Sequence, residues 1–142
     1  DHGVMTNTFN FLKRCESAGI KGVPGVEAYV KGIGSVLSRA HMIIVAKDAV
    51  GLSAIYKAVS ESYAPENIED DFPHMDLDTL RKYMGPGTEG HGHVIATSAC
   101  VGGPLALILL NNTYAEQAIF NKVKKQKEYD NPSSVTYKNK KG

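Results

Sequence analysis

The strongest constraint on the fold is the stretch 93–104, His-Val-Ile-Ala-Thr-Ser-Ala-Cys-Val-Gly-Gly-Pro. It predicts a buried strand that ends near Cys100, then a glycine-rich turn, then a helix over Leu105–Asn111. In α/β folds with parallel strands, functional side chains gather at the carboxyl ends of the strands. The stretch therefore predicts an α/β fold and makes Cys100 a candidate functional residue.

Other apolar runs predict further strands. Val26–Val30 is one, and the almost wholly apolar His41–Lys47 is another, which suits a strand covered on both faces of a parallel sheet. The glycine- and serine-punctuated segment Lys31–Arg39 between them predicts a loop.

Helical patterns separate most of these runs. Thr6–Ala18 carries apolar residues at helical spacing, and a second apolar stripe runs from Leu52 to Tyr63. Asp76 is the predicted N-cap of a short helix, and a last helix is predicted over Tyr114–Glu128. Alternating strands and helices indicate an α/β layer or barrel with a parallel sheet.

Composition narrows the functional classes. A net charge of +1 leaves no basic footprint for nucleic acid outside the lysine-rich tail, which we interpret as a solvated surface. Two cysteines, Cys15 and Cys100, without a Cys-x-x-Cys pair favour a reducing, cytoplasmic setting. No apolar run reaches the length that a membrane span requires, so no membrane contact is expected.

Potential metal ligands stand at predicted strand ends: His2, Glu27, His41 and Cys100. Glu27 interrupts an apolar strand, and because burying an unpaired charge is costly, it must meet solvent, a cation or a site. Nitrogen, oxygen and sulfur donors together suit zinc, manganese or iron better than calcium or magnesium alone. Several such ions in one site would serve to activate water and hold a phosphoester.

Each of these residues also has a structural interpretation. His2 could belong to a simple Asp-His-Gly turn, His41 could be a hydrogen-bonded structural histidine, and Cys100 could be a small core residue. The metal-site hypothesis depends on the four residues together. His74, His91 and His93 are interpreted as lying outside the site.

These motifs resemble the PHP (polymerase and histidinol phosphatase) domain, and most closely the version that opens the alpha subunit of bacterial DNA polymerase III. The resemblance runs over roughly residues 1–120. It is carried by Asp-His-Gly at 1–3, Pro-Gly-Val-Glu-Ala-Tyr-Val at 24–30, His-Met-Ile-Ile-Val-Ala-Lys at 41–47 and Ser-Ala-Cys at 98–100.

The resemblance implies an incomplete, distorted (βα)7 TIM-like barrel with parallel strands. On the matching positions His2, Glu27, His41 and Cys100 would bind the metal ions, and Asp1 would orient His2. The opening His-x-His strand of the family would lie before Asp1 and is absent, and its late Asp-x-His pair, expected well after Cys100, does not appear either. We therefore expect at most one or two bound ions, little hydrolysis by the chain alone, and self-association through an unpaired sheet edge.

The domain prediction is a partial PHP domain over 1–128 and a flexible lysine-rich tail over 129–142. By resemblance the chain is a piece of a replicative DNA polymerase, bacterial or phage, whose PHP domain is a metal-dependent phosphoesterase and 3′–5′ exonuclease or a scaffold. Its partners would be DNA, through the parent polymerase, the proofreading subunit and other replisome subunits. Two alternatives remain: a stand-alone phosphatase of the histidinol-phosphatase type, and a structural domain with a vestigial site.

Overall fold

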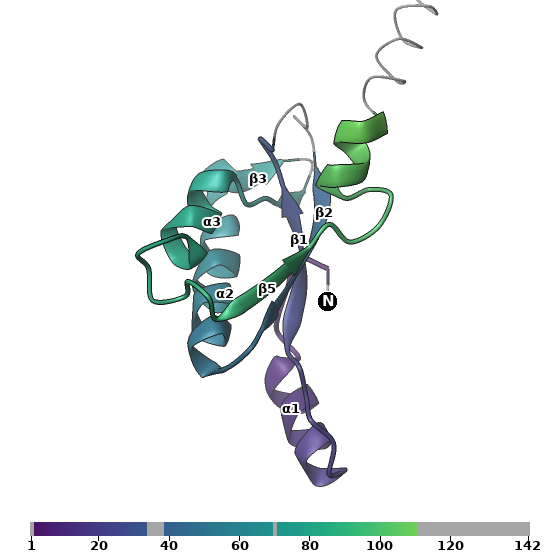
Figure 1. Ribbon diagram of the computed structural model, residues 1–142, viewed down its shortest axis with the longest axis vertical. Helices are drawn as coiled ribbons and strands as arrows, with labels where there is room; N and C mark the ends of the chain where they lie inside the picture. Colours follow the sequence, from purple (N-terminus) through teal and green to yellow (C-terminus); the bar gives the residue numbers. More distant parts are fainter. Residues whose placement is uncertain (1, 34–38, 70, 111–142) are drawn as a thin grey trace, which may run out of the picture. The chain divides into compact units, whose positions relative to one another are not determined.

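The computed structural model describes residues 2–33, 39–69 and 71–110 (Figure 1). All the labelled helices and strands belong to one unit, Asp1–Ile108. The position predicted to orient His2, Asp1, lies outside the described residues, and so do the predicted helix Tyr114–Glu128 and the tail 129–142.

A three-stranded sheet with the order β1-β2-β5 forms the centre of this unit. It consists of β1 (Gly25–Val30), β2 (Ala40–Ala46) and β5 (Val94–Thr97). The middle strand, β2, pairs antiparallel with both neighbours, so that Tyr29 lies opposite His41 and Val45 lies opposite Ile95. The prediction of parallel strands is therefore wrong for this sheet, whereas the mixed α/β class is confirmed.

The antiparallel pairing of β1 with β2 has a simple cause. A parallel connection needs a crossover of about a dozen or more residues, usually with a helix, whereas residues 31–39 alone join these two strands. The short link returns the chain alongside β1 as a hairpin.

The predicted helices are present close to their expected bounds: α1 (Thr8–Ser17), α2 (Ala49–Ser62) and α3 (Leu77–Met84). Asp76 caps α3 as predicted, because its carboxylate accepts a hydrogen bond from the Thr79 N–H at 2.8 Å. The chain between α2 and α3 forms η1 (Pro65–Asn67) and a small antiparallel hairpin, β3 (Ile68–Glu69) and β4 (Phe72–Pro73). No helix among the described residues is long and apolar enough to cross a membrane.

The core lies between α2 and one face of the sheet (Figure 1). Alternate residues of each strand point to this face, since successive side chains of a strand alternate. Each fully buried aliphatic side chain contributes about 1.5–3 kcal/mol. The core residues that these elements contribute are Val26, Ala28 and Val30 from β1, Ala40, Ile44 and Ala46 from β2, and Ile55, Ala58 and Val59 from α2.

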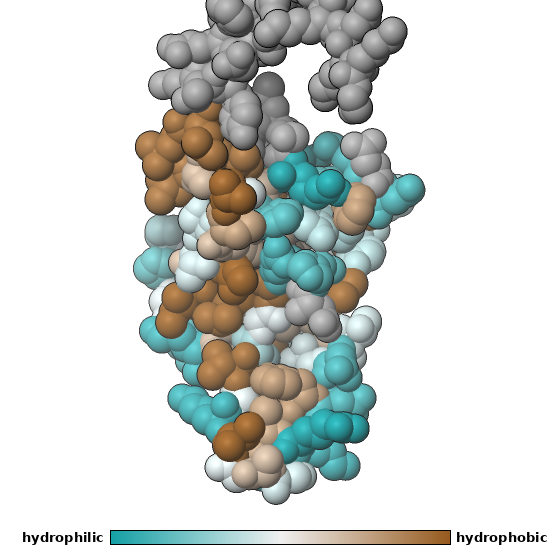
Figure 2. All heavy atoms as spheres, turned by 90° about the vertical axis from the view of Figure 1, so that its right-hand side faces the viewer, coloured by the Kyte–Doolittle hydropathy of each residue, from teal (hydrophilic) through white to brown (hydrophobic). Residues whose placement is uncertain are grey.

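The opposite face of the sheet, which we call the open face, is partly exposed to solvent. Ile43 and Ile95 on it are 37% and 52% exposed, and Figure 2 shows apolar side chains gathered on this side. Two expectations are therefore wrong. The strand predicted over His41–Lys47, β2, is buried on one face and not on both. The strand predicted to be buried before Cys100, β5, is a largely exposed strand at the edge of the described sheet. Glu27, Tyr29 and His41 alternate with the buried residues and so belong to the open face.

Candidate metal centre

His2 lies beside β1. It forms an isolated parallel bridge with Glu27, and the next residue, Gly3, donates its N–H to the Glu27 carbonyl at 2.8 Å. Gly3 has a φ of +68°, which a glycine adopts without strain. This tight turn sets the His2 imidazole against the Glu27 carboxylate, and the two side chains form an ion pair through Nδ1 and Oε2 when the histidine is protonated.

The same carboxylate reaches a second imidazole. Glu27 Oε1 lies 3.0 Å from Nδ1 of His41, on the neighbouring strand β2. Glu27 is directly opposite Ile43 in the register, so His41 is its diagonal neighbour on the open face. With its side chain 18% exposed, Glu27 bridges the two histidines across the sheet edge.

Cys100 approaches from the turn after β5. Its Sγ lies 3.6 Å from His41 Nδ1 and accepts the Gly102 N–H at 3.3 Å. A backbone hydrogen bond joins this turn to β2, since the His41 N–H donates to the Gly102 carbonyl at 2.8 Å. The four predicted side chains therefore do meet, in the order His2, Glu27, His41, Cys100, and their role as metal ligands remains a prediction.

The donor atoms suit a metal such as zinc. Bonds of about 2.0–2.3 Å in tetrahedral geometry place neighbouring ligand atoms roughly 3.3–3.6 Å apart. The Glu27–His41 and His41–Cys100 separations, 3.0 and 3.6 Å, are near this spacing. However, no three His, Cys, Asp or Glu side chains of the described residues are arranged to hold a common ion. The donors contact one another instead, so an ion would have to replace these direct contacts.

Two histidines interpreted as lying outside the site have other partners. His74 is buried, and its Nδ1 lies 2.9 Å from the Phe72 carbonyl. His93 lies at the end of β5 opposite to Cys100, and its Nδ1 is 2.6 Å from Asp48 Oδ2. The Gly51 N–H and then His93 lower the pKa of Asp48 by hydrogen bonding to its carboxylate.

Three residues beside the candidate ligands were not predicted from the sequence to belong to the site. The Tyr29 ring lies 5.5 Å from the His41 ring, and the Arg39 guanidinium lies over the rings of Tyr29 and Phe72. Tyr29 shares the odd-numbered face of its strand with Glu27, a signal that the sequence does contain. Phe72 arrives from a separate hairpin, and no local pattern places it there.

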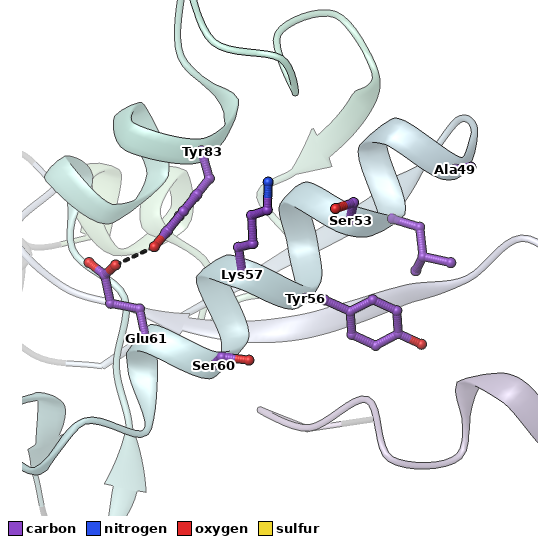
Figure 3. Close-up of a pocket in the computed structure, with 8 residues that line it drawn as sticks. Ala49, Ser53, Tyr56, Lys57, Ser60, Glu61 and Tyr83 are labelled. Carbon is purple, nitrogen blue, oxygen red and sulfur yellow. Dashed lines mark hydrogen bonds between the residues drawn. The ribbon is translucent and has the colours of Figure 1, made fainter.

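A groove lies elsewhere, on the outward side of α2 (Figure 3). Its volume is about 780 Å³, and it is lined by Tyr56, Lys57 and Tyr83 among others. Glu61 at its end accepts hydrogen bonds from Lys82 and the Tyr83 hydroxyl, which lower its pKa and tie α2 to α3. None of the predicted site residues lines this groove.

Comparison with known proteins extends these observations. Residues 1–131 match the PHP domain family. The chain is 32% identical over 126 residues to the DNA polymerase III subunit alpha of Borreliella burgdorferi, a match covering 82% of this chain and 10% of that protein. It is 31% identical over 146 residues to the subunit of the same name from Aquifex aeolicus, covering 91% and 11%. It is 27% identical over 121 residues to the DNA polymerase III subunit alpha of Thermus aquaticus, a match covering 79% of this chain and 9% of that protein. The chain thus spans about a tenth of the length of these relatives.

Proposed function

Since this chain belongs to the PHP domain family, we propose that it is the PHP domain of a DNA polymerase III alpha subunit and that its open face carries a metal-dependent phosphoesterase site. The contacts that join His2, Glu27, His41 and Cys100 support this proposal most directly. These contacts join side chains from four separate segments, and all four are of types that bind metal ions.

We also propose that the sheet is part of the wall of a distorted (βα)7 barrel. In such barrels the helices lie outside and the opposite face of the strands turns inward. Here α2 covers one face, and the candidate ligands lie on the other. The parallel bridge of His2 to Glu27 supports a further, parallel neighbour beside β1. The antiparallel pairs involving β2 are the distortion.

Each residue has a defined task in this proposal. His2, Glu27, His41 and Cys100 hold zinc, manganese or iron ions, which when bound activate water and neutralise the charge of a phosphodiester. Glu27, placed between both imidazoles, fixes their orientation. The Gly102 N–H donates to Cys100 Sγ and holds this sulfur beside His41.

The proposed substrate is the 3′ end of a DNA strand, and the proposed partners are the polymerase, its proofreading subunit and other replisome subunits. The names of the relatives favour this over a stand-alone phosphatase of the histidinol-phosphatase type, because three alpha subunits match most of this chain. A scaffold with a vestigial site would keep the fold but bind no ion.

Zinc stoichiometry tests the proposal. The purified chain is dialysed against zinc and then against metal-free buffer, and bound zinc is measured by mass spectrometry. We expect one or two ions per chain, a loss of bound zinc in Cys100→Ser, and retention in Cys15→Ser, whose thiol is buried on α1. If the wild-type chain bound no zinc, the metal-site proposal would be refuted and a scaffold with a vestigial site would remain.

A further inference from the structure

We propose that Arg39 binds a backbone phosphate of a single-stranded DNA end as that end enters the candidate metal centre. This inference rests on the proposed function for the nature of the substrate. In this inference, an arginine that lies over two aromatic rings contacts the DNA next to the candidate metal centre.

The aromatic rings fix the position of the guanidinium. Arg39 Cζ lies 4.0 Å from the centre of the Phe72 ring and 5.4 Å from that of Tyr29. The two rings meet edge to face at 5.5 Å and 86°. Stacking occupies a face of the planar guanidinium and leaves the N–H donors along its edge available to a ligand.

The position of Arg39 connects it to the cluster. Arg39 immediately precedes β2 and stands two residues before His41, and its contact with the Tyr29 ring places it on the open face with His41. Tyr29 lies between them, opposite His41 in the register and 5.5 Å from its ring. A chain of DNA that places one phosphate at Glu27 and His41 would therefore pass Arg39 with a neighbouring phosphate.

Charge and geometry favour a phosphate over other ligands. Arg39 is exposed and has no carboxylate partner among the described residues, whereas the nearby Lys31 is paired with Glu69 at 2.5 Å. A planar guanidinium binds phosphate through two parallel hydrogen bonds. The guanidinium already covers the Phe72 ring, so a nucleobase has no direct access to that face. The contact would be independent of base sequence, as a site for any DNA end requires.

The test is the binding of fluorescein-labelled oligothymidylate to the 142-residue chain in the presence of a chelator, followed by fluorescence anisotropy. Arg39→Gln should weaken binding about tenfold and reduce the slope of log affinity against log salt by about 0.7. Arg39→Lys keeps the charge but loses the planar guanidinium that binds phosphate through two hydrogen bonds. Its affinity should lie between those of the wild type and Arg39→Gln. Phe72→Leu removes the stacking surface and should weaken binding with Arg39 intact.

Arg14→Gln is the matched control, because it removes the same charge from an exposed position on α1. Circular dichroism checks that each variant is folded. Wild-type affinity in Arg39→Gln, an equal loss in Arg14→Gln, or no binding by the wild-type chain would overturn the inference. Arg39-dependent binding in a chain that takes up no zinc would support it while refuting the metal-dependent function.

Discussion

Glu27 and His41 form a diagonal pair across two antiparallel strands, with Glu27 Oε1 3.0 Å from His41 Nδ1. The hairpin of β1 and β2 alone creates this pair, so the centre of the candidate site is built from residues close together in sequence. The two outer donors, His2 and Cys100, are brought to it by backbone hydrogen bonds to β1 and β2. The stability of the hairpin and the affinity of the site should therefore be coupled.

The first prediction concerns the bridging carboxylate. Glu27→Gln keeps the shape of the side chain but removes its charge, and should weaken zinc binding by more than about tenfold. Isothermal titration calorimetry measures the change. Glu89→Gln, on an exposed loop, should leave the affinity unaltered. Equal affinities for the wild type and Glu27→Gln would remove Glu27 from the ligand set.

Part of this arrangement could be predicted from the sequence, and the limits have physical causes. His2, Glu27, His41 and Cys100 were identifiable because each stands at the end of an apolar run or in a turn beside one. The sequence also contains the evidence against parallel pairing of β1 with β2, because the short segment 31–39 leaves no room for a crossover helix. The exposure of β5 could not be predicted from the sequence. The apolar run Val-Ile-Ala is the same whether the strand lies in the centre of the sheet or at its edge. The contact of Arg39 with Phe72 depends on how the β3–β4 hairpin packs, which no local pattern encodes.

The second prediction concerns the close approach of α2 to the end of β5. A Cβ on Gly51 would lie 2.0 Å from the His93 carbonyl oxygen, which no side-chain rotation relieves. Gly51→Ala should therefore destabilise the fold by about 1–3 kcal/mol, despite the better helix propensity of alanine. Urea unfolding measures this free energy. Ser53→Ala, on the exposed side of the same helix, should change it little, and a stabilised Gly51→Ala would contradict the packing.

The third prediction concerns the cap of α3. The Thr79 N–H, hydrogen-bonded to the Asp76 carboxylate, holds the pKa of Asp76 below its ordinary value of 3.8. Asp76→Ala should lower the free energy of unfolding by about 1 kcal/mol at neutral pH. Asp76→Asn retains a capping oxygen and should lose less. An unchanged stability in Asp76→Ala would show that the cap contributes nothing.

The fourth prediction is the pH dependence of that cap. Because the pKa of Asp76 is lower in the folded than in the unfolded state, its charge stabilises the fold above pH 3.8. This contribution is lost as the pH falls below that value and through the folded-state pKa. The difference in unfolding free energy between the wild type and Asp76→Asn should shift accordingly in urea titrations across this range. A difference that stays constant with pH would contradict the assignment.

X-ray absorption at the zinc edge of the zinc-loaded chain tests the central claim most directly. A site built from His2, Glu27, His41 and Cys100 predicts one sulfur neighbour at about 2.3 Å, with nitrogen and oxygen neighbours at about 2.0–2.2 Å. The sulfur should disappear in Cys100→Ser and persist in Cys15→Ser. A first shell of oxygen atoms alone, identical in all three proteins, would contradict the account.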